Sequence, residues 1–138
     1  MQRQGQGTEI DRRSMLTIGL SGASVLLVAQ RESAWAQRLE EKGKVERKES
    51  KPIDSMVPGF QKVRVREVTY HPGASTKAKM QNAMICECTQ GVLEVMQDDM
   101  KFTANKGDMW TCRVGMVEAN ANNGTGPATM RVIDLLTS

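Results

Sequence analysis

The chain has 138 residues, which is enough for one domain and leaves little room for a second. Apolar residues make up 39% of it, charged residues 25%, and the net charge is +3. A nucleic-acid binder needs a stronger and more clustered positive charge, and an aromatic content of 4% leaves few side chains on which bases could stack. The composition therefore argues against nucleic acid as a partner, and the single histidine limits every proposal for a metal or acid–base site.

The first segment has the pattern of an export signal. Arg12 and Arg13 precede a weakly apolar run over residues 18–29. This run is too short for a membrane span, which needs roughly 20 apolar residues. Residues 34–36 then supply the small side chains that a signal peptidase requires. We predict a signal peptide over residues 1–36, cleaved before Gln37; an uncleaved anchor and an amphipathic helix are the alternatives.

The segment resembles a twin-arginine signal in its arginine pair, in the following Leu16 and in its weak apolar core, although Met15 stands where Phe is commoner. The resemblance implies that the export machinery is a partner and that the protein reaches the periplasm already folded. All three cysteines then lie in the mature chain and meet an oxidising compartment.

Residues 37–57 are rich in charges of both signs and almost free of large apolar side chains. Such a segment buries too little surface to offset the cost of ordering it. We therefore expect a charged, flexible linker between the signal and a domain over residues 58–138.

From residue 60 onward, short apolar runs alternate with turn residues. Val63 and Val65 alternate with basic residues. Val68 and Tyr70 continue on the other parity, which predicts a bulge near Arg66. Further strand candidates are residues 84–89, 92–96, 101–104, 108–112, 116–121 and 128–136. Short strands with turn signals every eight to twelve residues indicate an all-β domain, a sandwich or a barrel.

The strongest pattern starts at Gly107. Five residues separate Gly107 from the turn Arg113-Val114-Gly115. Two residues separate this turn from Glu118, and three more separate Glu118 from Asn122. This spacing resembles the second motif of the cupin superfamily, with Arg in place of Pro and Glu in place of His. The resemblance covers roughly residues 60–136 and implies a cupin-type jelly-roll β-barrel.

The first cupin motif is degenerate in this chain. Its Pro-Gly turn matches Pro72-Gly73 and its final glycine matches Gly91. Counting back from that glycine places Met84 where the family has Glu. The family's histidine pair falls within residues 78–81, where no histidine occurs. The resemblance thus implies a cupin without its usual histidine metal site, so we predict no cofactor, and we expect His71 to be an ordinary residue near the rim.

The cysteines offer three alternatives. Alternate residues of a strand share a face, so Cys86 and Cys88 point inward if Met84 does. The cupin topology implies that Cys112 lies opposite or diagonal to Cys86, with Trp110 nearby. The three thiols are then buried core side chains, or Cys112 forms a disulfide with Cys86 or Cys88, or they form a soft-metal site, copper for instance, with nearby methionines. The methionines near enough to contribute are Met80, Met84, Met109 and Met116.

Glu118 can act as a general base in the barrel mouth, or it can simply pair with Lys79 or Arg113. We hypothesise first a binding protein for an unknown small molecule. The expected pocket residues are Lys79, Gln81, Met84, Cys86, Cys88, Trp110, Cys112, Arg113 and Glu118. The alternatives are an isomerase- or dioxygenase-like enzyme that uses Glu118, with a soft metal held by Met84, Cys86, Cys88 and Cys112, and a filled barrel that acts through its surface or as a homodimer.

Overall fold

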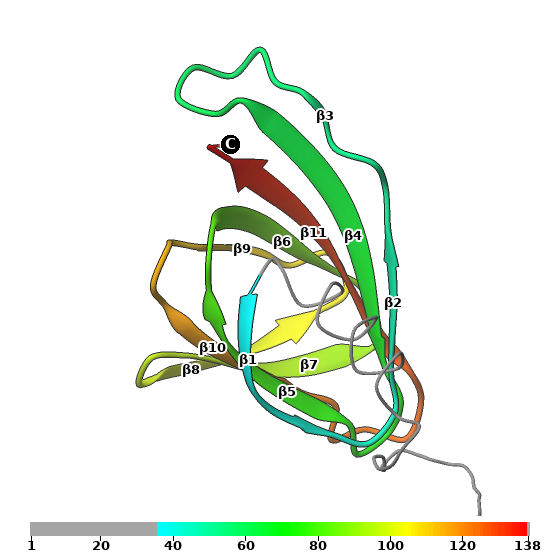
Figure 1. Cartoon of the computed structure of the whole chain (residues 1–138). Helices are drawn as coiled ribbons and strands as arrows, with labels where there is room; N and C mark the ends of the chain where they lie inside the picture. The colour runs from blue at the N-terminus through cyan, green and yellow to red at the C-terminus, as the bar shows by residue number, and fades with distance from the viewer. Residues whose placement is uncertain (1–35, 138) are drawn as a thin grey trace, which may run out of the picture. The chain divides into compact units, whose positions relative to one another are not determined.

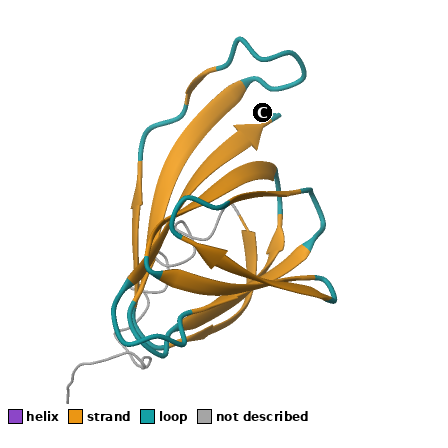
Figure 2. Ribbon diagram, turned by 180° about the vertical axis from the view of Figure 1, so that it is seen from behind, coloured by secondary structure: helices purple, strands orange, loops and turns teal. Residues whose placement is uncertain are grey.

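The computed structural model describes residues 36–137. All but the last residue of the predicted signal peptide lies outside them. The described chain is all-β, with two antiparallel sheets that enclose one core (Figures 1 and 2). The prediction of an all-β jelly-roll barrel is confirmed by this arrangement. The described residues include no helix long and apolar enough to cross a bilayer.

One sheet has five strands and the other six. The five-stranded sheet has, in spatial order, β1 (Ala36–Lys42), β5 (Ser75–Met80), β10 (Val117–Ala121), β7 (Val92–Gln97) and β8 (Met100–Asn105). The six-stranded sheet has β2 (Val45–Glu49), β4 (Lys62–Tyr70), β11 (Ala128–Leu136), β6 (Ala83–Gln90) and β9 (Met109–Cys112), with β3 (Ile53–Asp54) paired to β4. In Figure 1, β4 and β11 continue beyond the rest of the barrel, together with β3.

Strict alternation explains why β6 and β9 each bury one face. In β6, Met84, Cys86 and Cys88 are buried, and the residues between them are partly exposed. In β9, Trp110 and Cys112 are buried between exposed neighbours. Because successive side chains of a strand point to opposite faces, these residues converge on the core from the six-stranded sheet.

Strand β4 corrects one prediction. The pairing of β4 with β11 runs without interruption from Tyr70 to Lys62, so the predicted bulge near Arg66 is wrong. The apolar residues change parity because the strand is apolar on different faces in its two halves: Val63 and Val65 face outward, whereas Val68 and Tyr70 face the core.

The structure also differs from the expectation of a flexible linker over residues 37–57. β1 pairs with β5, and β2 and β3 pair with β4, each at the edge of its sheet. Edge strands are held mainly by backbone hydrogen bonds and tolerate charged side chains on both faces. A charged composition therefore does not exclude strands here. The ion pair between Arg47 and Glu41 adds a side-chain contact within this segment.

Candidate functional site

Three potential metal-ligating side chains meet inside the barrel. Cys86 comes from β6 and Cys112 from β9 of the six-stranded sheet, and Glu118 comes from β10 of the five-stranded sheet. One ligand atom of each lies within 4.8 Å of the others, and all three residues are buried. The centre therefore joins the inner faces of both sheets.

The carboxylate of Glu118 is held by uncharged donors. Trp110 Nε1 and Gln97 Nε2 each donate to Oε2 over 3.0 Å. The Cys112 thiol donates to the same oxygen over 3.2 Å, and Asn120 Nδ2 donates to Oε1 over 3.2 Å. Burying a carboxylate is costly unless hydrogen bonds compensate it, and these four donors supply that compensation while fixing its orientation.

Glu118 therefore does not form an ion pair with Lys79 or Arg113, which was one of its two expected roles. Arg113 is exposed and pairs instead with Asp98, with Nη2 to Oδ2 at 3.2 Å. Lys79 is exposed on the outer face of β5, because Ala78 and Met80 take the inward positions. Both cations lie outside the core that contains Glu118.

Gln97 orients the centre from the neighbouring strand β7. Its Nε2 donates to the backbone carbonyl of Thr111 over 2.8 Å and approaches Cys112 Sγ at 3.5 Å. The same amide nitrogen reaches Glu118, so one side chain contacts both potential ligands. Sequence reasoning missed Gln97 and Asn120; their inward parity on β7 and β10 was the available signal.

The two thiols of the centre touch each other. The contact with Cys86, then burial, and then the negative charge of Glu118 raise the pKa of the Cys112 thiol. Such a thiol is protonated in neutral solution, and it is a poor nucleophile because the thiolate is the reactive form.

All three cysteines are free thiols in the structure, so neither expected disulfide is formed. Cys86 pairs with Trp110 and Cys112 pairs with Met84, which makes the two cysteines diagonal neighbours. Diagonal residues of an antiparallel pair are about 7–8 Å apart, beyond the usual Cα separation for a disulfide. Cys88 is farther along the strand, where its thiol donates to the carbonyls of Gln90 and Gly91.

The other predicted residues divide into two groups. Met84 and Trp110 are buried beside the centre, and Met80 is buried on β5. Gln81 is exposed in the turn after β5, and Met109 faces outward with 64% of its surface exposed, so neither contributes to a pocket. His71 lies near the surface, where its Nε2 pairs with Glu46.

A buried ion pair lies next to this centre and was not predicted. Asp134 accepts hydrogen bonds from Arg66 Nε at 2.6 Å, Arg64 Nε at 2.9 Å and Asn82 Nδ2 at 3.1 Å. Burial alone would raise the pKa of Asp134, but Arg66, Asn82 and Arg64 together hold it below its usual value. Arg66 also contacts Met84 Sδ at 3.9 Å, so Met84 separates the ion pair from Cys112.

Comparison with known proteins rests on the fold, because no family model and no curated protein matches the chain. A predicted oxalate decarboxylase from Thermotoga maritima superposes with a TM-score of 0.58, at 17% identity over 73% of this chain and 91% of that one. A Cupin 2 conserved barrel domain protein from Salinispora arenicola gives 0.55, at 14% identity over 66% and 75%. The chain has the cupin fold. A cupin superfamily protein from Desulfitobacterium hafniense gives 0.52, at 17% identity over 69% and 80%.

The residues at the positions that match the metal ligands of the cupin motifs cannot form an imidazole site. Ala78 and Met80 are the inward residues of the segment expected to hold the histidine pair, and Met84 stands where the cupin motif has Glu. Ala78 is the cross-strand partner of Glu118. Among these positions only Glu118 offers a ligand suited to the usual first-row metals. Cys86 and Cys112 extend its donor set with sulfur.

Proposed function

We propose that this cupin-fold protein binds one thiophilic metal ion, zinc or copper(I), through Cys86, Cys112 and Glu118. The observation that carries the proposal is the convergence of their ligand atoms within 4.8 Å inside the barrel. Thiolate and carboxylate are established zinc ligands, and thiolates also select copper(I). Three protein ligands are typical of zinc sites that keep a position for water or substrate.

The strand register favours a metal over a disulfide. A disulfide between the diagonal pair Cys86 and Cys112 would require the strands to move, because its Cα atoms must lie closer. Two sulfur atoms on one metal, each about 2.3 Å from it, can be farther apart than two bonded sulfur atoms. The contacting thiols therefore suit a shared ion without a change of register.

The raised pKa of the Cys112 thiol favours a role as a metal ligand over a role as a nucleophile. Its raised pKa leaves little thiolate for attack on a substrate. A bound metal removes the thiol proton outright, because a coordinating thiol is deprotonated. The same environment that makes Cys112 a weak nucleophile thus leaves it competent as a ligand.

The surrounding hydrogen bonds suit a metal ligand at Glu118. Trp110, Gln97 and Asn120 orient the carboxylate, and such partners hold ligands in place at metal sites. The metal would supply a Lewis acid or a redox centre in a buried site. We place this function in the periplasm, on the strength of the predicted signal peptide, which would allow the ion to be loaded before export.

The alternative of a metal-free small-ligand pocket is less well supported. Three of the expected pocket residues, Lys79, Gln81 and Arg113, are exposed and away from the core. A small molecule can still bind as an additional ligand of the metal, and this is the form in which we retain the small-molecule partner.

Metal analysis by mass spectrometry, after equilibration with zinc or copper(I) and removal of free metal, tests the proposal. We expect one ion per chain, lost in Cys112→Ser and kept in Cys88→Ser. Cys88 is the matched control because it is a buried cysteine on the same strand as Cys86 whose thiol bonds to Gln90 and Gly91 instead. Absence of metal in the parent protein, or equal loss in both variants, would contradict the proposal.

A further inference from the structure

Asn120 has a buried carbonyl oxygen that the described residues leave without a hydrogen bond. The side chain is 3% exposed and faces inward from β10, two residues after Glu118. Its Nδ2 donates to Glu118 Oε1 over 3.2 Å, whereas its Oδ1 has no partner among the described residues. Because a carboxylate oxygen only accepts, this contact fixes which end of the amide is the oxygen. A buried acceptor without a donor is costly, so we expect a bound molecule to supply the donor.

The strand register shows what surrounds Asn120 within the described part of the chain. On β5 its partner is Thr76, whose hydroxyl pairs with Tyr70 Oη at 2.7 Å. On β7 its partner is Val95, whose side chain is buried and apolar. Asn122, the next inward residue along the chain, uses its amide nitrogen on backbone carbonyls. The side chains beside Asn120 are therefore either apolar or already paired.

The charge of the proposed metal centre favours a neutral ligand at its open position. Two thiolates and a carboxylate together carry more charge than a zinc or copper(I) ion compensates. The arginines of β1, β2 and β4 each contact a carboxylate already: Arg38 and Arg47 that of Glu41, and Arg64 and Arg66 that of Asp134. An anion at the open position would therefore add negative charge to a buried site that already has an excess of it.

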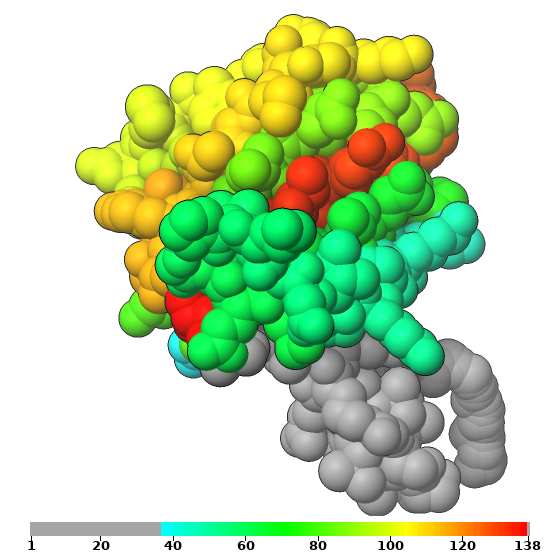
Figure 3. Space-filling view, turned by 90° about the horizontal axis from the view of Figure 1, so that it is seen from above, coloured from blue at the N-terminus to red at the C-terminus, as the bar shows by residue number. Residues whose placement is uncertain are grey.

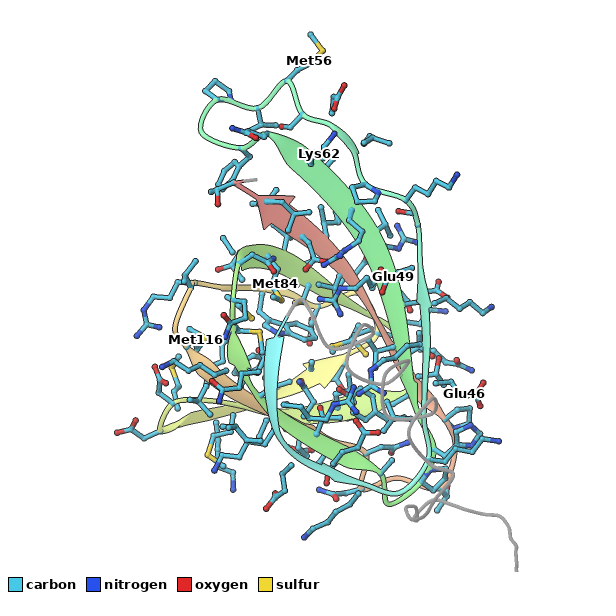
Figure 4. The ribbon with its side chains drawn as sticks, viewed as in Figure 1. Glu46, Glu49, Met56, Lys62, Met84 and Met116 are labelled. Carbon is cyan, nitrogen blue, oxygen red and sulfur yellow. The ribbon has the colours of Figure 1, made fainter. Side chains whose placement is uncertain are left out.

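The packing around the centre favours a small ligand. Met84, which is labelled in Figure 4, extends from β6 towards the space between the sheets and is buried. Met116, labelled in the same view, packs against the core just before β10. In the view from above (Figure 3), the described side chains pack closely, with the C-terminal strand beside residues around 50–65. A molecule that reaches Asn120 through such packing is small.

We propose that the open position of the metal takes a small neutral hydroxyl compound, water at rest and an alcohol in its place, whose O–H donates to Asn120 Oδ1. The inference rests on the proposed metal site, because Glu118 is both a ligand of the ion and the partner of Asn120 Nδ2. The amide holds the carboxylate with one end and the incoming hydroxyl with the other. An alcohol satisfies the buried acceptor, which a molecule without a donor does not, and it adds no charge, which an anion does.

Titrations of the cobalt(II)-loaded protein test the proposal. Cobalt(II) binds to the same kinds of sites as zinc, and its visible spectrum changes with the ligand at the open position. The probes are methanol, acetonitrile, which is neutral but has no donor, and azide, which is an anion. Methanol should change the spectrum of the parent protein at the lowest concentration. Equal or tighter binding of acetonitrile would contradict the role of the Asn120 acceptor, and tighter binding of azide would contradict the preference for a neutral ligand.

Asn120→Leu should lose the preference for methanol, because removal of the acceptor weakens methanol binding by about tenfold. Trp110→Phe is the matched control, since it also removes one donor to Glu118 but keeps the Asn120 acceptor. It should retain the preference for methanol over acetonitrile. Asn120→Ala repeats the test with a side chain that adds no atoms to the core. A preference for methanol that persists in both Asn120 variants would overturn the proposal.

Cobalt content separates this inference from the metal site itself. A parent protein that binds cobalt but shows no preference for methanol would overturn the inference and leave the metal site standing. A parent protein that takes up neither cobalt nor zinc would overturn both.

Discussion

Cys86 and Cys112 lie diagonally across the β6–β9 pair, with Cys86 opposite Trp110 and Cys112 opposite Met84. Their thiols touch, and the Cys112 thiol also donates to Glu118. This arrangement distinguishes between a disulfide and a shared metal ion as the role of the two cysteines. The diagonal backbone positions disfavour a disulfide, while the contacting side chains and the adjacent carboxylate provide donors for one metal ion.

Trp110→Phe should weaken metal binding without removing a ligand. The substitution deletes the indole N–H that donates to Glu118 Oε2 over 3.0 Å. Loss of a hydrogen bond that orients a metal ligand typically costs about 10–100-fold in affinity. Competition with a chromophoric chelator measures the change, and Phe102→Leu, at the ring that packs edge-on against Trp110, is the control for packing. An unchanged affinity in Trp110→Phe would show that Glu118 needs no orientation by the indole.

Metal affinity should fall as the pH is lowered. Each thiol that binds metal must release its proton, so the apparent affinity decreases by up to about 100-fold per pH unit where both thiols are protonated. The raised pKa of Cys112 extends this dependence to higher pH than for an ordinary thiol. Titrations between about pH 6 and 9 measure the slope. A pH-independent affinity would mean that neither thiol is a ligand.

Asp134→Asn should destabilise the fold strongly. Asp134 and Arg66 are both almost fully buried, and the substitution removes the carboxylate charge that pairs with the Arg66 guanidinium inside the core. The cost of such a change is about 3–5 kcal/mol in the free energy of unfolding. Urea denaturation measures it, with Asp54→Asn as the control because Asp54 pairs with Lys62 at the surface. Equal midpoints for the two variants would contradict a structural role for the buried pair.

The same pair predicts acid sensitivity. The pKa of Asp134 is lower in the folded chain than its usual value. Its contribution to stability is therefore present above the ordinary carboxyl range, near pH 4, and is lost as the pH falls through the lower folded value. In Asp134→Asn, the fall in melting temperature between about pH 5 and pH 3 should be smaller than in the parent protein. A parallel fall in both would show that other carboxyls dominate.

Gly91→Ala should destabilise the hairpin between β6 and β7. Gly91 has a φ of 69°, and a Cβ placed there would come within 2.5 Å of the Pro127 carbonyl oxygen. The left-handed backbone alone costs a non-glycine residue about 1–2 kcal/mol, and the close contact adds to it. Gly126→Ala is the control, because no described atom lies within 4 Å of the position that its Cβ would take. Thermal melts should separate the two variants clearly, and coincident melts would contradict a strained backbone at Gly91.

Much of the fold is predictable from local sequence. The spacing from Gly107 to Glu118 and Asn122, through its resemblance to the second cupin motif, implied the turn between β9 and β10 and the inward position of Glu118. With Met84 placed inward by the cupin resemblance, period-two alternation predicted that Cys86 and Cys88 face the core, and the cupin topology implied the same of Cys112. These signals are local, because the alternation of a strand and the residues of a turn depend on neighbours in the sequence.

The remaining features depend on contacts between distant segments. β1 and β2 are strands because β5 and β4 offer them free edges, and a charged sequence gives no sign of that. Arg66 is buried because Asp134, 68 residues later, pairs with it on the neighbouring strand. The predicted ion pair of Glu118 was wrong because parity directs Lys79 outward while Gln97 reaches the carboxylate from β7.

X-ray absorption spectroscopy of the zinc-loaded protein tests the proposed metal centre most directly, because it identifies the atoms bound to the metal. We expect two sulfur neighbours at about 2.3 Å and at least one oxygen at about 2.0–2.2 Å. Cys88→Ser, which should keep the ion, should give the same spectrum as the parent protein. A spectrum of nitrogen and oxygen neighbours alone would contradict a metal centre at Cys86, Cys112 and Glu118.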